Sequence, residues 1–222
     1  MIETEIKAQK LKFKTNANVF SPSSIDTGTL AMLDFIDFKS GDKVLDLGCG
    51  YGVVGILAAK ILNPQDVYIS DISSDAISLS RANLVLNDVE KVNIVQSNGF
   101  ENIPEKDFNI IASNPPYHED FKIPKQFIEN GYRHLALGGR MFMVTKRRTW
   151  YKMKFISVFG GVSIFEKNGY FVFMAEKKEN KLKKEKKNHQ LLKKKRNRLK
   201  RKERKRKLKR KKLNRLLKIQ NK

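Results

Sequence analysis

The chain has 222 residues, a formal net charge of +23, one cysteine and three histidines. One cysteine excludes an intramolecular disulfide, and three scattered histidines give no metal-ligand spacing, so we expect no metal site. We expect a cytoplasmic monomer without a membrane span, since no apolar run approaches the roughly 18 residues that a span requires and the N-terminus lacks the basic start and apolar run of a signal peptide.

The positive charge is concentrated at the C-terminal end. Residues 1–178 carry 22 Lys and Arg against 20 Asp and Glu, a net charge of +2, whereas residues 179–222 carry 24 against 3, a net charge of +21. The first part has enough Val, Ile, Leu and Phe for a sizeable core. We therefore predict three parts: an N-terminal segment over 1–24, a globular domain over 25–178, and a Lys/Arg-rich tail over 179–222 that is helical or disordered.

The N-terminal segment begins with polar residues and then reads as a loop that exposes Phe13 and Phe20. Apolar residues at helical spacing predict an amphipathic helix over 25–38. Asp26 lies at the start of this helix, and its simplest interpretation is a helix cap. We expect the N-terminal segment to contribute to the face that binds the substrate.

From Asp42 onward, strand and helix patterns alternate along the chain. This alternation predicts βαβ units and an α/β fold with a seven-stranded, mainly parallel sheet. Asn168 and Gly169 form a hairpin signal, so the last two strands should be an antiparallel hairpin. In such folds, ligands bind beyond the carboxyl ends of the strands. The expected strands are 43–47, 67–71, 91–96, 108–113, 140–145, 162–166 and 169–175, and the expected helices are 53–62, 74–87, 121–136 and 150–158.

The strand over 43–47 runs into three glycines at alternate positions, Gly48, Gly50 and Gly52. Glycines let the backbone turn tightly and approach a ligand closely, and the helix behind them offers unpaired N–H groups. With Asp46, the pattern Asp-x-Gly-x-Gly-x-Gly resembles motif I of the class I S-adenosylmethionine (SAM)-dependent methyltransferases. The resemblance implies a Rossmann-like fold and SAM as the cofactor. The alternative is a tight turn that binds no ligand.

The ends of the next two strands offer further candidate cofactor-binding residues. Asp71 ends the second strand, where an acid can accept hydrogen bonds from a ribose diol, although it could instead cap the following helix. Asn98 follows the third strand and could bind the amino edge of adenine, although an Asn in that place is more often a turn residue. We include the adjacent Ile72 and Gly99 in the predicted cofactor site.

The sharpest motif is Asn114-Pro115-Pro116-Tyr117, which directly follows an apolar strand. The prolines fix φ and remove two backbone donors, which leaves a rigid, carbonyl-lined turn. The Asn114 side-chain oxygen and the Pro115 carbonyl could accept both N–H bonds of an exocyclic amine beside the cofactor, and Tyr117 could stack on a flat substrate. Transfer would then depend on positioning and carbonyl electrostatics rather than on a general base. The alternative is a proline segment that only ends the strand and forms a loop, or a proline-rich peptide ligand.

Several flanking segments resemble the ribosomal RNA small-subunit guanine-N2 methyltransferase family, and in particular its single-domain relatives. These segments are 13–21, 26–28, 97–100, 143–148, 159–161 and 167–170. The resemblance implies that the glycine motif, Asp71 and Asn98 bind SAM and that residues 114–117 hold the target guanine. The best-known members carry a second, N-terminal domain and commonly Asn-Pro-Pro-Phe, and this chain has neither. Glutamine-N5 methyltransferases of release factors and adenine-N6 methyltransferases therefore remain alternatives.

Two basic regions favour RNA over a protein or small molecule as the substrate. Opposite phosphates, the tail could add affinity without reading sequence, although a solubilising tail, a nuclear address or a membrane patch are alternatives. A second basic cluster, Lys146, Arg147, Arg148, Lys152 and Lys154, lies beside the predicted substrate face, where Phe20 is a candidate aromatic contact.

The combined prediction is a Rossmann-like methyltransferase that transfers a methyl group from SAM to an exocyclic amine of RNA. Guanine N2 of small-subunit (16S) ribosomal RNA is the expected target, and ribosomal RNA or the ribosomal subunit the expected partner. A non-catalytic RNA-binding ribosome-assembly factor is the alternative from another class of protein.

Overall fold

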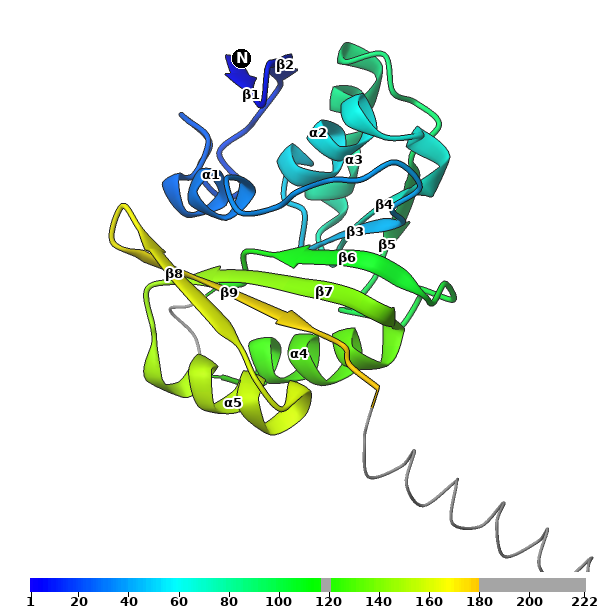
Figure 1. Ribbon diagram of the computed structural model, residues 1–222. Coiled ribbons are helices and arrows are strands. Elements are labelled where there is room, and N and C mark those ends of the chain that lie inside the picture. The colour runs from blue at the N-terminus through cyan, green and yellow to red at the C-terminus, as the bar shows by residue number, and fades with distance from the viewer. Residues whose placement is uncertain (117–120, 180–222) are drawn as a thin grey trace, which may run out of the picture. The chain divides into compact units, whose positions relative to one another are not determined.

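The computed structural model describes residues 1–116 and 121–179 (Figure 1). Residues 1–178 form a compact unit built on a seven-stranded sheet with the order β5-β4-β3-β6-β7-β9-β8. Neighbouring strands from β5 to β7 are parallel, whereas β9 is antiparallel to β7 and β8, which confirms the predicted sheet and its C-terminal hairpin. The strands are β3 (Val44–Leu47), β4 (Val67–Asp71), β5 (Asn93–Gln96), β6 (Phe108–Ser113), β7 (Leu135–Thr145), β8 (Ser163–Lys167) and β9 (Tyr170–Glu176).

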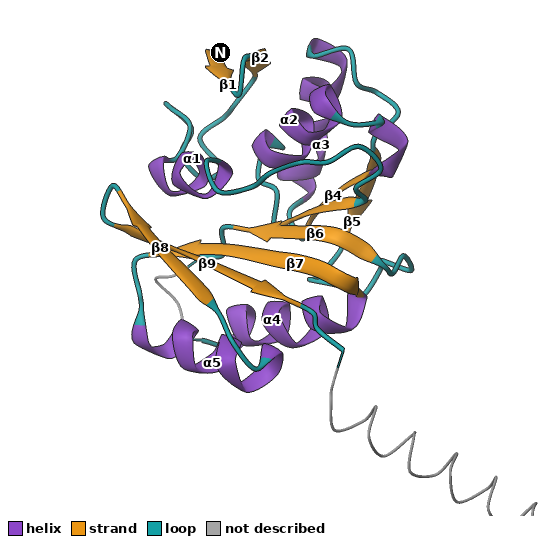
Figure 2. Cartoon of the chain, viewed as in Figure 1, coloured by secondary structure: helices purple, strands orange, loops and turns teal. Residues whose placement is uncertain are grey.

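Helices cover both faces of the sheet (Figure 2). On one face lie α1 (Thr27–Leu33), α2 (Val53–Ile61) and α3 (Ser74–Leu86), and on the other lie α4 (Lys122–His134) and α5 (Thr149–Phe159). Alternate strand residues feed the two cores, because successive side chains of a strand point to opposite faces. Val44 and Ile110 belong to one core and Leu45 and Ile111 to the other. The four residues of β3 are all buried, which places the glycine turn at the centre of the sheet.

The polar N-terminus forms a β-hairpin that the sequence analysis did not predict. It pairs β1 (Ile2–Ile6) with β2 (Gln9–Phe13). From β2 onward the chain lies against α3, where two buried asparagines one turn apart, Asn83 in the helix and Asn87 just after it, bind its backbone. Asn87 accepts from the Lys12 N–H (3.0 Å) and donates to the Lys12 carbonyl (2.7 Å), and Asn83 does the same at Lys14 (2.7 and 3.0 Å). Phe13, expected to be exposed, is fully buried between these two anchors.

Some predicted boundaries also differ from the structure. The first helix ends at Leu33 rather than at residue 38, because Phe35 stacks on Phe165 with ring centroids 4.4 Å apart and Ile36 turns into the core. β7 begins five residues earlier than expected, and its early part pairs with the residue after β9: the Gly138 N–H donates to the Lys177 carbonyl, and the Lys177 N–H donates to the Gly139 carbonyl. A short 3-10 turn, η1 (Pro64–Asp66), precedes β4. None of the described helices has the length and apolar character that crossing a membrane requires.

Candidate active site

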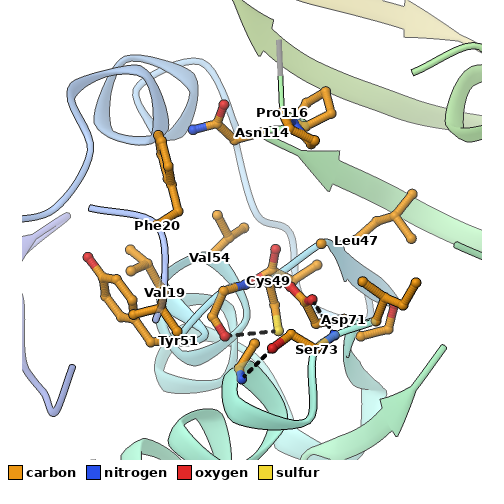
Figure 3. Close-up of a pocket in the computed structure, with 18 of the residues that line it drawn as sticks. Val19, Phe20, Leu47, Cys49, Tyr51, Val54, Asp71, Ser73, Asn114 and Pro116 are labelled. Carbon is orange, nitrogen blue, oxygen red and sulfur yellow. Dashed lines mark hydrogen bonds between the residues drawn. The ribbon is translucent and has the colours of Figure 1, made fainter. Parts of the chain in front are cut away.

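A cavity of about 400 Å³ opens where β3, β4, β5 and β6 end (Figure 3). This is the edge of the sheet at which the sequence analysis expected the ligand. Most of the predicted site residues line it: Phe20, Asp46, Gly48, Gly50, Asp71, Ile72, Asn98, Gly99, Asn114, Pro115 and Pro116. Among the described residues, Gly52, Lys146, Arg147 and Arg148 do not line the cavity. Tyr117 lies outside the described residues, so its predicted stacking role stays a prediction.

At Gly48 and Gly50 the glycine turn lines the cavity with backbone. Gly48 and Gly50 adopt φ of 73° and 58°, a region that favours glycine. The N–H groups of Gly48 and Cys49 both donate to the Ser70 carbonyl, at 2.8 and 3.0 Å, and hold the turn against β4. Gly52 has a different task. It precedes α2 with φ of 92°, and a Cβ there would lie 3.2 Å from the Ser80 hydroxyl oxygen, so it serves packing and the turn.

Asp71 links the glycine turn to the start of α3. One carboxylate oxygen accepts from the Gly50 N–H (2.9 Å) and the other from the Ser73 N–H (2.9 Å). The side chain that caps α3 is Ser73, whose hydroxyl accepts from the Ala76 N–H, so the alternative of Asp71 as the helix cap is wrong. A carboxylate offers about four lone-pair sites, and Asp71 can therefore still accept from vicinal hydroxyls of a ligand in the cavity.

Asp46 is a carboxyl group beside the cavity with only 3% of its surface exposed. It accepts a hydrogen bond from the Gly55 N–H at 2.9 Å. Burial raises the pKa of Asp46 to about 7, the Gly55 hydrogen bond opposes this change, and the nearby Asp71 adds to it. A cation in the cavity would lower this pKa again and favour the carboxylate. The site therefore suits a ligand with a positive charge.

The end of the cavity near β5 is lined by apolar groups, with the polar Asn98 at its rim. Gly99 has φ of 60°, and a Cβ there would lie 3.3 Å from the Phe127 ring, so glycine lets the backbone pack closely against this ring. Asn98 is exposed and donates to the Glu101 side chain at 3.0 Å, while Ile72 projects at the rim. Phe127, from α4, was missed by the sequence analysis, because within a helical pattern it reads as an ordinary core residue. This end fits a flat aromatic ring.

Asn114 directly follows β6 and has an amide with two different environments. Its nitrogen donates to the Asp26 carboxylate at 2.8 Å and to the Thr29 hydroxyl at 3.0 Å. Its oxygen is buried and accepts no hydrogen bond. Asp26 also accepts from the Thr29 N–H at 2.8 Å, so the predicted helix cap is confirmed, but the second bond to Asn114 was missed. That bond joins residues 88 positions apart, and no local sequence pattern predicts it.

The loop after β2 forms another wall of the cavity and presents Phe20, which is 54% exposed. The loop is anchored on both sides. Asn18 donates to Asp75 of α3 at 3.0 Å, and the Tyr51 hydroxyl lies 3.4 Å from the carbonyls of Ser21 and Ser24, to which it donates. Burial, with a smaller effect from the Asp26 carboxylate, raises the pKa of Tyr51 to about 12, so this donor keeps its proton.

The basic residues after β7 lie on aromatic rings rather than in the cavity. Lys146 lies 4.9 Å from the centre of the Tyr170 ring, Arg147 lies 5.2 Å from the centre of the Phe121 ring, and Arg148 lies 5.7 Å from that of Phe171. Such contacts order long cationic side chains at a surface. In the part of the chain that the structure describes, no group of His, Cys, Asp and Glu could hold a metal ion.

One protein family and several known proteins match about three quarters of this chain. The family described as "methyltransferase small domain" matches residues 10–175. The ribosomal RNA small subunit methyltransferase C of Hamiltonella defensa is 33% identical over 169 residues, which cover 74% of this chain and 50% of that protein. The uncharacterized protein YbxB of Bacillus subtilis is 28% identical, over 78% of this chain and 89% of that protein. The chain thus spans about half the length of the methyltransferase C relatives that it matches.

Solved structures show the same fold. The T. thermophilus 16S rRNA N2 G1207 methyltransferase (RsmC), in complex with AdoMet and guanosine, superposes with a TM-score of 0.74 at 24% identity, over 80% of this chain and 50% of that one. A methyltransferase from Pyrococcus furiosus gives a TM-score of 0.61 at 18% identity, over 76% of this chain and 90% of that one. Together with the match over residues 10–175, these findings confirm the resemblance seen in the sequence. The chain belongs to the methyltransferase small-domain family.

Proposed function

We propose that this protein is a SAM-dependent methyltransferase that acts on an exocyclic amine of RNA, and that the amine is N2 of a guanine in small-subunit ribosomal RNA. The observation that carries the proposal is the Asn114 amide. Its nitrogen is already bonded within the protein, its oxygen lacks a donor, and it lines the same cavity as the glycine turn. A buried acceptor without a donor costs about 1–3 kcal/mol, and a substrate N–H would remove that cost.

The described residues fit SAM. Asp71 would accept from the ribose hydroxyls, Asn98 and Gly99 with Ile72 would surround the adenine, and Asp46 would favour a positive charge nearby. Gly48 and Gly50 let the backbone approach the ligand without a side chain in between. When bound, SAM supplies an electrophilic methyl group on a cationic sulfur. Asn114 lines the same cavity, is bonded to Asp26 and Thr29 at the start of α1, and would border both ligands.

Asn114 and Pro115 would hold the amine by accepting its two N–H bonds. This holds the nitrogen in place and directs its lone pair, which is the main requirement for a weak nucleophile in an in-line transfer. The acceptors also stabilise the positive charge that grows on the nitrogen as it is methylated. The amine can lose its proton afterwards, so no general base is needed. Pro115 and Pro116 line the cavity and keep this corner rigid.

The substrate base would stack on aromatic side chains at the mouth of the cavity. Phe20 presents an exposed ring there, and stacking of a base on an aromatic ring contributes about 1–3 kcal/mol. We propose the same contact for Tyr117, which follows the double proline in the sequence. A base in a folded RNA must leave its stack to enter such a cavity.

The RNA backbone would contact the basic residues outside the cavity. Lys146, Arg147 and Arg148 are ordered by the rings beneath them and follow β7 at its carboxyl end. The tail over 179–222 would add many more cations, with affinity that falls as salt rises. We also propose that residues 1–24 belong to the substrate face, that 25–178 form the catalytic domain, and that the protein works as a monomer in the cytoplasm.

A methyl-transfer assay tests this function. The full chain is incubated with tritiated SAM and small ribosomal subunits that lack the modification, and the RNA is digested to nucleosides. We expect label in N2-methylguanosine, and we expect Asn114→Ala to abolish transfer while SAM binding, measured by calorimetry, persists. Label in protein or in N6-methyladenosine would contradict the substrate, and failure to bind SAM would favour the assembly-factor alternative.

A further inference from the structure

Asp26 and Thr29 fix the orientation of the Asn114 amide. Both belong to the start of α1, 85 or more positions away in the sequence, and both accept a hydrogen bond from the same amide nitrogen. Figure 3 shows this nitrogen on one side of the side chain and the oxygen on the other. An amide has two donor hydrogens and one acceptor oxygen. With both hydrogens committed, the oxygen is the atom that remains for a ligand.

The opposite orientation of the amide is strongly disfavoured. A flipped side chain would place the Asn114 oxygen where the nitrogen now lies, 2.8 Å from a carboxylate oxygen of Asp26, so two acceptors would face each other. The carboxylate bond also polarises the amide, because donation to an anion strengthens the acceptor at its other end. The fold therefore presents a fixed and strengthened acceptor at Asn114.

We propose that Asp26 and Thr29 are positioning residues that make the site select an N–H donor, an amine, over a group that lacks one. This inference rests on the proposed function. It extends that function from Asn114, which would touch the substrate, to the residues that orient the Asn114 amide. Asp26 has two tasks, since it also caps α1 through the Thr29 N–H. A test must therefore keep the cap while it removes the contact with Asn114.

The double variant Asp26→Ser/Thr29→Val separates these tasks. Serine is a good helix cap, but its shorter side chain does not reach Asn114, and valine keeps the shape of threonine without the hydroxyl. The matched control is Asp34→Ser, which removes a carboxylate from the other end of α1, where it pairs with Lys167 and has no bond to Asn114. Binding of SAM by calorimetry checks that each variant retains the cofactor site.

The first measurement needs no substrate. In 15N-labelled protein, the Asn114 side-chain amide protons, assigned by their loss in Asn114→Ala, should exchange with water at least roughly tenfold faster in the double variant than in the unaltered chain or in Asp34→Ser. Equal exchange in the unaltered chain and the double variant would overturn the proposal, since the two bonds would then not hold the amide.

The second measurement compares the affinities for two nucleosides, one with the exocyclic amine and one without it. Guanosine and inosine differ only in the exocyclic amine, and their dissociation constants are measured by titration with saturating SAM. We expect guanosine to bind roughly tenfold more tightly than inosine to the unaltered chain, and this ratio to fall towards one in the double variant. An unchanged ratio of the two dissociation constants would overturn the proposal. This includes the case in which both nucleosides bind equally more weakly, as a general loss of structure would cause. Equal binding of both nucleosides to the unaltered chain would instead refute guanine as the substrate, and amide exchange would then decide the role of Asp26 and Thr29.

Discussion

Replacement of Asp46 by asparagine should stabilise the ligand-free protein at pH 8. The pKa of Asp46 rises from 3.8 to about 7 on folding, mainly by burial. This change of about 3 pH units, at about 1.4 kcal/mol each, sets an upper limit of about 4 kcal/mol. Because the folded-state pKa is raised, the contribution of Asp46 to stability is fully present below about pH 4 and is lost as the pH rises through 7. The asparagine side chain would keep an oxygen for the Gly55 N–H without the charge.

Urea denaturation of ligand-free Asp46→Asn should therefore give a free energy of unfolding about 2–4 kcal/mol higher than that of the unaltered chain at pH 8, and an equal value at pH 4. The same variant should bind SAM more weakly, because a neutral amide does not attract a cation. Asp37→Asn, away from the cavity, is the control and should change stability by less than about 0.5 kcal/mol. A lower stability at pH 8, or an offset that does not depend on pH, would refute the reasoning.

Three further changes test other parts of the structure. Asn83→Ala/Asn87→Ala should lower the free energy of unfolding by about 2–4 kcal/mol and speed hydrogen exchange in β1 and β2, since Asn87 bonds to the backbone of β2 and Asn83 to the residue just after it; unchanged exchange would contradict this role. Gly55→Ala should destabilise the protein by about 1–2 kcal/mol in urea, because its Cβ would lie 2.4 Å from an isoleucine of β4, whereas Gly161→Ala has open space and should be neutral; equal effects would contradict the packing. Deletion of 179–222 should weaken RNA binding roughly tenfold or more and flatten its salt dependence, and unchanged binding in filter assays at several salt concentrations would favour a protein substrate.

The sequence predicted those features that have a local cause. Alternating apolar runs indicated the parallel sheet, and glycines at positions of positive φ indicated the turn beside the cavity. The Asn168-Gly169 pair indicated the hairpin, because both residues adopt the positive φ that a tight hairpin turn requires.

Features with distant causes escaped prediction. The β1–β2 hairpin is an exception, because both of its strands alternate apolar and polar residues and the sequence analysis overlooked this pattern. Asn87 and Asn83 then bind the chain at Lys12 and Lys14. Phe13 looked like an exposed loop residue because its burial depends on these anchors. Asp26 looked like a helix cap, which it is, and nothing near it in the sequence indicates the bond to Asn114. Long-range pairs of this kind become visible only when the fold brings the segments together.

The central claim is that the double-proline corner and the glycine turn act together on a guanine amine of ribosomal RNA. Its most direct test is a map of N2-methylguanosine in small-subunit ribosomal RNA from host cells with the protein, without it, and with Asn114→Ala in its place. The account predicts that one N2-methylguanosine disappears in the second and third cases and is present in the first. An identical set of N2-methylguanosines in all three would contradict it.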